Sequence, residues 1–269
     1  MDSTRHAIRS FVLAIALAMA RSAAAEPPDA FSTGLAHDFF QDRQIVESAE
    51  FVALDAPVNA ADAALVPVTM AIRAPQGDAR RVVKMTLIID NNPVPLAGAF
   101  TLGEKAGLVQ IATRVRVNSD TYLHLVAELS DGALVASKRY VHAAGGCSAP
   151  ATKAVDGAAA RLGQLKFRML PDIVHGRREA VVMIRHPNFT GMQMDESTHD
   201  YTPARYVDHF AVYQGENLVF ALDGGIAISE DPNFRFAFRV DENQTIRVEA
   251  ADIAGGRFSS AWDIIGGGG

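Results

Sequence analysis

Large apolar side chains alternate with other residues along several short stretches of the chain. The alternation is clearest in YLHLVAEL (122–129) and FRFAFRV (234–240). A period of two residues is that of a β-strand with one buried face. Turn-forming residues such as Asn91-Asn92-Pro93 follow such runs, so the pattern predicts an all-β protein made of antiparallel sandwiches, with one helix near 37–46. Further short apolar runs lie at 82–89, 111–117, 133–141, 179–186, 209–214 and 245–250.

The predicted strands stop at Val141 and resume near Gln164. Between them, residues 142–163 hold eight alanines, four glycines and no aromatic residue. Such a composition predicts a flexible Gly/Ala-rich arm that joins two β-sandwich domains. We place the domains at 30–141 and 164–265, and we expect the four glycines at 266–269 to form a flexible tail.

The chain starts with the layout of a secretory signal peptide. Arg5 and Arg9 precede a ten-residue apolar run at 11–20, and three alanines at 23–25 provide a cleavage site. We therefore expect residues 1–25 to be removed on export and the mature protein to be periplasmic, with no membrane contact after cleavage. The remaining 22 basic and 30 acidic side chains give a net charge of −8, which argues against nucleic acid or anionic lipid as a partner.

Cys147 is the one cysteine in 269 residues. An unpaired cysteine in an exported protein is buried and inert, joined to another chain, or used chemically. Its neighbours Gly145, Gly146 and Ser148 offer no apolar packing, and the two glycines give the backbone freedom. The pattern favours an exposed thiol on a pliable segment, which serves as a handle for covalently attached cargo.

Enzymatic chemistry finds little support in the sequence. A catalytic thiol needs a positioned base, and the nearby His142 lies on the same predicted flexible arm. Two methionines and two histidines within fourteen residues could bind copper, but loop methionines and a structural histidine are the more common interpretation of such a group. We therefore predict a carrier with no catalytic residues, no metal and no cofactor. The four residues of that copper alternative are His186, Met192, Met194 and His199.

Four segments resemble a known pair of families, in order along the chain. LVPVTMAIR (65–73), KMTLIIDNNPVPLAGAFTLG (84–103) and VHAAGGCSAP (141–150) are similar to SoxY, and IRHPNFTGM (184–192) is similar to SoxZ. These are the two subunits of the periplasmic sulfur-compound carrier. The fused arrangement is similar to SoxYZ-like carriers associated with quinoprotein (PQQ) dehydrogenases.

The resemblance implies two immunoglobulin-like sandwiches packed against each other. It also implies that Cys147 carries sulfur intermediates, such as a thiosulfonate or persulfide, between periplasmic enzymes. The SoxZ-like domain would support the SoxY-like domain without chemistry of its own. The partners implied are sulfur-oxidation enzymes or a quinoprotein dehydrogenase system.

The chain departs from the SoxY pattern directly after the cysteine. Ser148-Ala149-Pro150 replaces the second Gly-Gly of the family signature, and the chain continues into the next domain instead of ending. A loop held at both ends needs a partner with an open cleft, or a proteolytic cut after Cys147. The departure also leaves open a second function, that of a non-covalent adaptor for a quinoprotein dehydrogenase. The cargo, the docking enzymes and the oligomeric state stay open.

Overall fold

The computed structural model describes residues 28–264, with gaps at positions 74, 76, 151–160, 196–197 and 243–244. The predicted signal peptide, the predicted tail and the centre of the predicted arm lie outside the described residues. Among the residues that are described, no helix is long and apolar enough to cross a membrane.

The described chain is built almost entirely of β-strands, as the alternating pattern predicts. The first domain holds β1 (Ile45–Glu47), β2 (Val52–Asp55), β3 (Val66–Ile72), β4 (Val82–Ile89), β5 (Leu96–Leu102), β6 (Gln110–Val115), β7 (Thr121–Leu129) and β8 (Leu134–Val141). The second holds β9 (Leu165–Val174), β10 (Arg177–Ile184), β11 (Val207–Gln214), β12 (Asn217–Gly224), β13 (Asn233–Phe238), β14 (Thr245–Asp252) and β15 (Arg257–Asp263).

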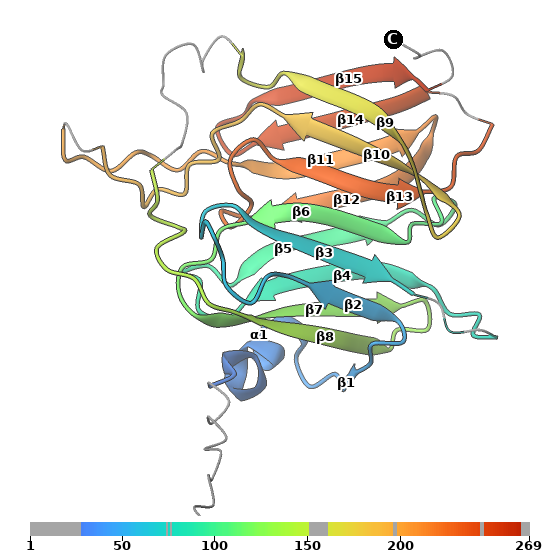
Figure 1. Ribbon diagram of the computed structural model, residues 1–269, viewed down its shortest axis with the longest axis horizontal. Coiled ribbons are helices and arrows are strands. Elements are labelled where there is room, and N and C mark those ends of the chain that lie inside the picture. The colour runs from blue at the N-terminus through green and yellow to red at the C-terminus, as the bar shows by residue number, and fades with distance from the viewer. Residues whose placement is uncertain are drawn as a thin grey trace, which may run out of the picture.

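The strands form two sheets that pack face to face (Figure 1). One sheet has nine strands in the order β1-β8-β7-β4-β5-β12-β11-β14-β15, and the other has six in the order β2-β3-β6-β13-β10-β9. Pairing is antiparallel except between β1 and β8. The prediction of an all-β fold with two β-sandwich domains is confirmed.

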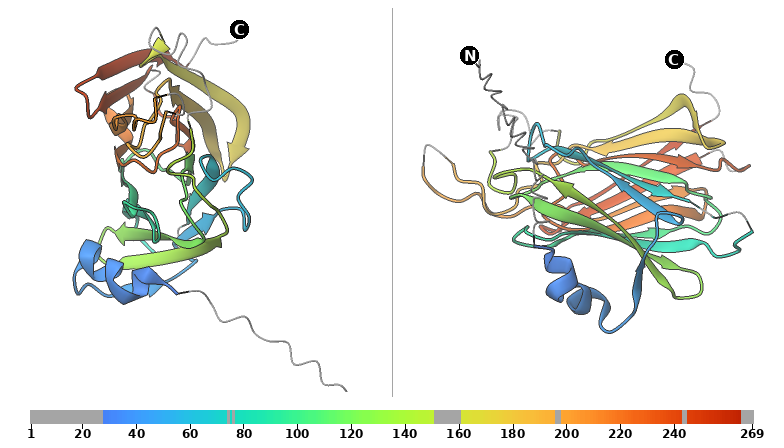
Figure 2. Two further views of the ribbon diagram at one scale, coloured as in Figure 1. Left: turned by 90° about the vertical axis from the view of Figure 1, so that its left-hand side faces the viewer. Right: turned by 60° about the horizontal axis from the view of Figure 1, so that its bottom comes forward.

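Both sheets run without a break from the first domain into the second (Figures 1 and 2). Strand β5 pairs with β12, with Phe100 opposite Leu222, and β6 pairs with β13, with Ile111 opposite Phe236. Gly103 follows β5, where a Cβ would lie 1.6 Å from the carbonyl oxygen of Leu218. The two sandwiches are therefore joined edge to edge, and the close approach at Gly103 requires glycine.

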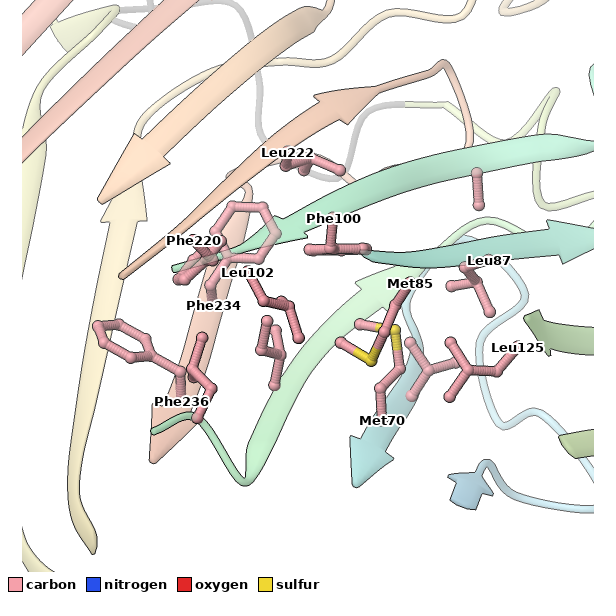
Figure 3. Packing of buried hydrophobic residues seen from close by; sticks show 14 of the residues in the cluster. Met70, Met85, Leu87, Phe100, Leu102, Leu125, Phe220, Leu222, Phe234 and Phe236 are labelled. Carbon is pink, nitrogen blue, oxygen red and sulfur yellow. The ribbon is translucent and has the colours of Figure 1, made fainter. Parts of the chain in front are cut away.

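A cluster of phenylalanines fills the space between the sheets at this junction (Figure 3). The ring of Phe100 in the first domain lies 6.3 Å from that of Phe234 and 6.4 Å from that of Phe220 in the second. One continuous hydrophobic core includes residues of both domains. Burial of an aromatic side chain contributes several kcal/mol, so this junction stabilises the whole chain.

The helix lies earlier in the chain than the prediction of 37–46. A π-helical turn η1 (Phe31–Leu35) leads into α1 (Ala36–Phe40), and β1 already begins at Ile45. Gln41 adopts a positive φ of 55° and ends the helix. Phe31 packs with Ile88, Val126 and Leu134 on the outer face of the nine-stranded sheet. The helix covers this part of the sheet from outside (Figure 2).

Candidate functional site

Cys147 lies in a tight turn that the fold holds in place. The chain leaves β8, and the backbone N–H of Gly145 donates to the carbonyl oxygen of Asn118 over 2.7 Å. The N–H of Gly146 donates to the carbonyl oxygen of Val117 over 3.1 Å, and the N–H of Ser148 closes the turn on the carbonyl oxygen of Gly145. We call residues 145–148 the cysteine turn.

The two glycines have different structural tasks. Gly145 has a φ of +74°, which favours glycine, and a Cβ there would meet nothing closer than 4.0 Å. At Gly146 a Cβ would lie 2.1 Å from the carbonyl oxygen of Ala63 and 2.5 Å from that of Val117. Gly146 therefore lets the cysteine turn enter a narrow gap in the first domain.

The thiol is buried, which corrects the expectation of an exposed sulfur on a flexible arm. Cys147 is 1% exposed. Gly145, Gly146 and Ser148 do not act as a free hinge in this conformation, because each takes part in the hydrogen bonds of the docked turn. The burying surface comes from segments that are distant in sequence, and the small neighbours of Cys147 do not reveal it.

Arg116 is the charged residue next to the cysteine turn. It follows β6, is 1% exposed, and its Nη1 donates to the carbonyl oxygen of Gly146 over 3.3 Å. Its Nε and Nη2 are buried and have no hydrogen-bond partner among the residues that the structure describes. Glu230 and Asp62 act on the guanidinium through their charge, but neither accepts a hydrogen bond from those two nitrogens.

The second domain completes the site through Thr190 and Gln193. The hydroxyl of Thr190 lies 2.8 Å from the carbonyl oxygen of Cys147 and 2.9 Å from Oε1 of Gln193. Both side chains are buried. The second domain thus contacts the backbone of the cysteine through Thr190, and Nε2 of Gln193 has no hydrogen-bond partner among the described residues.

The docked thiol is protonated and unreactive. Burial raises the pKa of Cys147 to about 11, against the opposing charge of Arg116. At pH 7 a thiol with that pKa is ionised in about one molecule in 10,000. Since the thiolate is the nucleophile, chemistry at Cys147 requires the cysteine turn to leave its gap.

Sequence reasoning missed Arg116, Thr190 and Gln193. Arg116 lies in the run IATRVRV, where alternation puts arginine on the outer face, and no local signal marks it as buried. Of the copper alternative, His186 already uses both ring nitrogens, Nδ1 with Asn188 over 2.7 Å and Nε2 with Asp252 over 3.2 Å.

Comparison with family models gives two matches in order along the chain. Residues 36–147 match the sulfur oxidation protein SoxY, and residues 174–263 match the sulphur oxidation protein SoxZ. The SoxY match ends at Cys147 itself. The cysteine turn is therefore the C-terminal end of the SoxY match, and Thr190 and Gln193 belong to the SoxZ match.

Two solved structures with local similarity are single-substitution variants of the superoxide reductase (neelaredoxin) from Ignicoccus hospitalis. The first has 10% identity, a TM-score of 0.30, and covers 35% of this chain and 79% of its own. The second has 10% identity, a TM-score of 0.32, and covers 39% of this chain and 96% of its own. A search of curated proteins finds no match.

Proposed function

Because the chain belongs to the SoxY and SoxZ families, as a SoxY domain followed by a SoxZ domain, we propose that it is a periplasmic thiol carrier and not an enzyme. Cys147 binds sulfur-compound intermediates covalently and presents them to sulfur-oxidation enzymes. The observation that carries the proposal is the position of this buried thiol next to Arg116, a buried guanidinium whose Nε and Nη2 have no hydrogen-bond partner among the described residues.

A buried donor without an acceptor destabilises the fold, so its presence suggests a group that pairs with it in another state of the protein. A buried polar group without a partner costs about 1–3 kcal/mol, and more when it is charged. Within the described part of the chain, Arg116 Nε and Nη2 are two such atoms beside the cysteine turn, and Nε2 of Gln193, which contacts Thr190 through its Oε1, is a third. A sulfonate group on the sulfur of Cys147 would offer a negative charge and three acceptor oxygens to these donors. Guanidinium groups suit such oxyanions because their donors form a planar fork.

The chemical step takes place outside the gap. When the thiol joins thiosulfate, one S–S bond forms, the thiol proton leaves, and two electrons pass to an acceptor on the partner enzyme. The docked state cannot support this step, since its thiol is buried and protonated. The carrier therefore alternates between an undocked turn that reacts and a docked turn that shelters the adduct from water and from other thiols.

Intact mass measurement of the protein from its native periplasm tests the proposal. We expect sulfur adducts on Cys147, absent from Cys147→Ser, on a chain that starts near Glu26. Adducts with sulfonate oxygens should be lost faster from Arg116→Met than from the parent, because the variant lacks the guanidinium. A chain that carries no adduct during active sulfur oxidation would contradict the carrier function.

One observation favours the second function, that of a non-covalent adaptor for a quinoprotein dehydrogenase. A buried thiol with a raised pKa is what an inert structural cysteine would show. The adaptor function predicts that Cys147→Ser keeps full activity in cells and that the sandwich surface alone binds the dehydrogenase. The carrier function predicts complete loss of activity in the same variant.

A further inference from the structure

A second buried polar cluster lies where the N-terminal helical segment meets the outer face of the nine-stranded sheet. Asp29 precedes η1, Asp90 follows β4, and His124 lies on β7. One ligand atom from each of the three lies within 4.8 Å of the others. The ring of Phe31 stacks on that of His124 with centroids 4.3 Å apart and covers the cluster from the helix side.

The distances from His124 to the two carboxylates are similar to those between two ligand atoms of one metal ion. Nε2 of His124 lies 3.4 Å from Oδ1 of Asp29 and 3.4 Å from Oδ2 of Asp90, without forming a hydrogen bond to either. A tetrahedral Zn²⁺ with bonds of about 2.0–2.2 Å holds its ligand atoms about 3.3–3.6 Å apart. The two distances from His124 Nε2 therefore match the spacing of ligands on one such ion, and all three ligand atoms lie within 4.8 Å of one another.

Two atoms of the cluster have no partner although they are deeply buried. The side chain of Asp90 is 1% exposed and its Oδ1 accepts no hydrogen bond. The side chain of His124 is 4% exposed and its Nε2, which faces both carboxylates, makes no hydrogen bond within the described part of the chain. Native proteins rarely leave such groups unsatisfied. A bound cation would give Nε2 of His124 a partner, and it would reach Oδ1 of Asp90 if this carboxylate binds through both oxygens, since Oδ2 also accepts the backbone N–H of Phe31.

We propose that Asp29, Asp90 and His124 bind one divalent transition-metal ion of the Zn²⁺ class, which ties the N-terminal helical segment to strands β4 and β7. Carboxylate oxygen and imidazole nitrogen are both zinc ligands, and the absence of thiolate makes the site intermediate in softness. The inference is independent of the carrier function, because none of the three residues belongs to the cysteine turn.

Lys138 reduces the negative charge of the site and contacts an oxygen of Asp29 that does not face His124. Its Nζ lies 3.1 Å from Oδ2 of Asp29, while Oδ1 of that residue accepts the backbone N–H of Ser32 and faces His124. The two carboxylates together carry more negative charge than the single ammonium group offsets, so the site attracts a divalent cation.

Metal content of the full exported chain tests the inference. Cys147→Ser serves as the parent, so that the thiol cannot bind zinc. After removal of metal and equilibrium dialysis against Zn²⁺, we expect one zinc per parent chain and less than about a tenth of that in Asp90→Asn and His124→Asn. The matched control is His142→Asn, which removes a histidine from an exposed pair with Asp120 and should keep one zinc.

Co²⁺ provides a readout that does not depend on the folding of variants. In the folded parent we expect visible bands of tetrahedral cobalt with nitrogen and oxygen ligands, and Zn²⁺ should abolish them by competition. We also expect bound zinc to slow amide hydrogen exchange in η1 and α1. No stoichiometric metal in the parent, or undiminished binding in folded Asp90→Asn and His124→Asn, would overturn the inference.

Discussion

Two buried charged networks, one around Asp252 in the second domain and one around Arg116 in the first, differ in how completely their polar groups are paired. Oδ2 of Asp252 lies 3.2 Å from Nε2 of His186 and 3.0 Å from Nε of Arg205. Its Oδ1 accepts the backbone N–H groups of Ala254 and Gly256. Every oxygen of this carboxylate is satisfied from within the chain.

The network around Arg116 has the opposite character. The guanidinium donates one hydrogen bond, to the carbonyl oxygen of Gly146, and leaves Nε and Nη2 unpaired. Desolvation lowers the pKa of Arg116, and the charges of Glu230, Cys147 and Asp62 act against this effect. A closed network stabilises the fold, whereas the network around Arg116 has donors left over that the proposed sulfonate adduct could pair.

The largest effect should come from breaking the closed network. Asp252→Asn removes the charge that faces His186 and Arg205, and removal of one partner from a buried charge network costs about 3–5 kcal/mol. Burial alone would raise the pKa of Asp252, but hydrogen bonds from Gly256, Arg205 and His186 hold it below its usual value. The carboxylate therefore stabilises the fold above pH of about 3.9, and this contribution is lost as the pH falls through the lowered pKa. Urea unfolding at several pH values measures both effects.

Arg116→Met is the matched control for that comparison. It removes a buried cation that has no hydrogen-bonded carboxylate, so we expect a loss of no more than about 1 kcal/mol, the value of one hydrogen bond. Equal destabilisation by Arg116→Met and Asp252→Asn would show that Arg116 is a structural cation and would remove the distinction between the two networks.

Gly146→Ala should have the next largest effect, on docking and not on the fold. The new Cβ would lie 2.1 Å from the carbonyl oxygen of Ala63, so the cysteine turn must leave its gap. We expect Cys147 to react with a membrane-impermeant alkylating reagent more than about 10-fold faster than in the parent, since exposure restores an ordinary thiol pKa. Reaction rates followed by mass spectrometry measure this.

Two variants control the alkylation experiment. Gly145→Ala places the same methyl group in open space of the same turn and costs only about 1–2 kcal/mol of left-handed backbone strain. Ser148→Cys in a Cys147→Ser background gives the rate of an exposed thiol one position further on. If Cys147 of the parent already reacts as fast as the thiol of that variant, the docked turn is not the main state in solution.

Thr190→Val should have the smallest effect. It removes the hydroxyl that contacts the carbonyl oxygen of Cys147, at a cost of about 1 kcal/mol, which corresponds to a roughly 5-fold increase in the alkylation rate. Thr190→Ser keeps the hydroxyl and should react as the parent does. An increase in both variants would assign the effect to packing of the methyl group and not to the hydrogen bond.

The strands could be predicted because their signal is local. Residues 82–89 form β4 with the bounds that the apolar run indicates, and the alternation in 122–129 lies within β7. The pairing of β5 with β12 could not be predicted, since both are edge strands of their own domain and no turn connects them. Register across such a junction depends on side-chain packing between distant segments.

The candidate site was visible in the sequence only through its cysteine. Gly145 and Gly146 indicated backbone freedom, and at Gly146 the missing side chain lets the turn enter a gap in the first domain. The burial of Cys147 depends on residues 63, 117 and 190, which are far apart in sequence. Arg116 occupies an outward-facing position in the strand alternation, so periodicity predicts that its side chain is exposed. In the structure it is buried. When the fold brings charged residues together from several strands, the hydrophobic periodicity of the sequence does not reveal the cluster.

The edge-to-edge union of the two sandwiches puts both sides of the cysteine site into one molecule. Thr190 and Gln193 belong to the same chain as Cys147 and to a domain that shares its core, so dilution cannot separate them. In a carrier assembled from two separate chains, the same contacts would be lost whenever the subunits dissociated. For the proposed carrier function, the fraction of buried thiol would then be independent of the concentration of the protein.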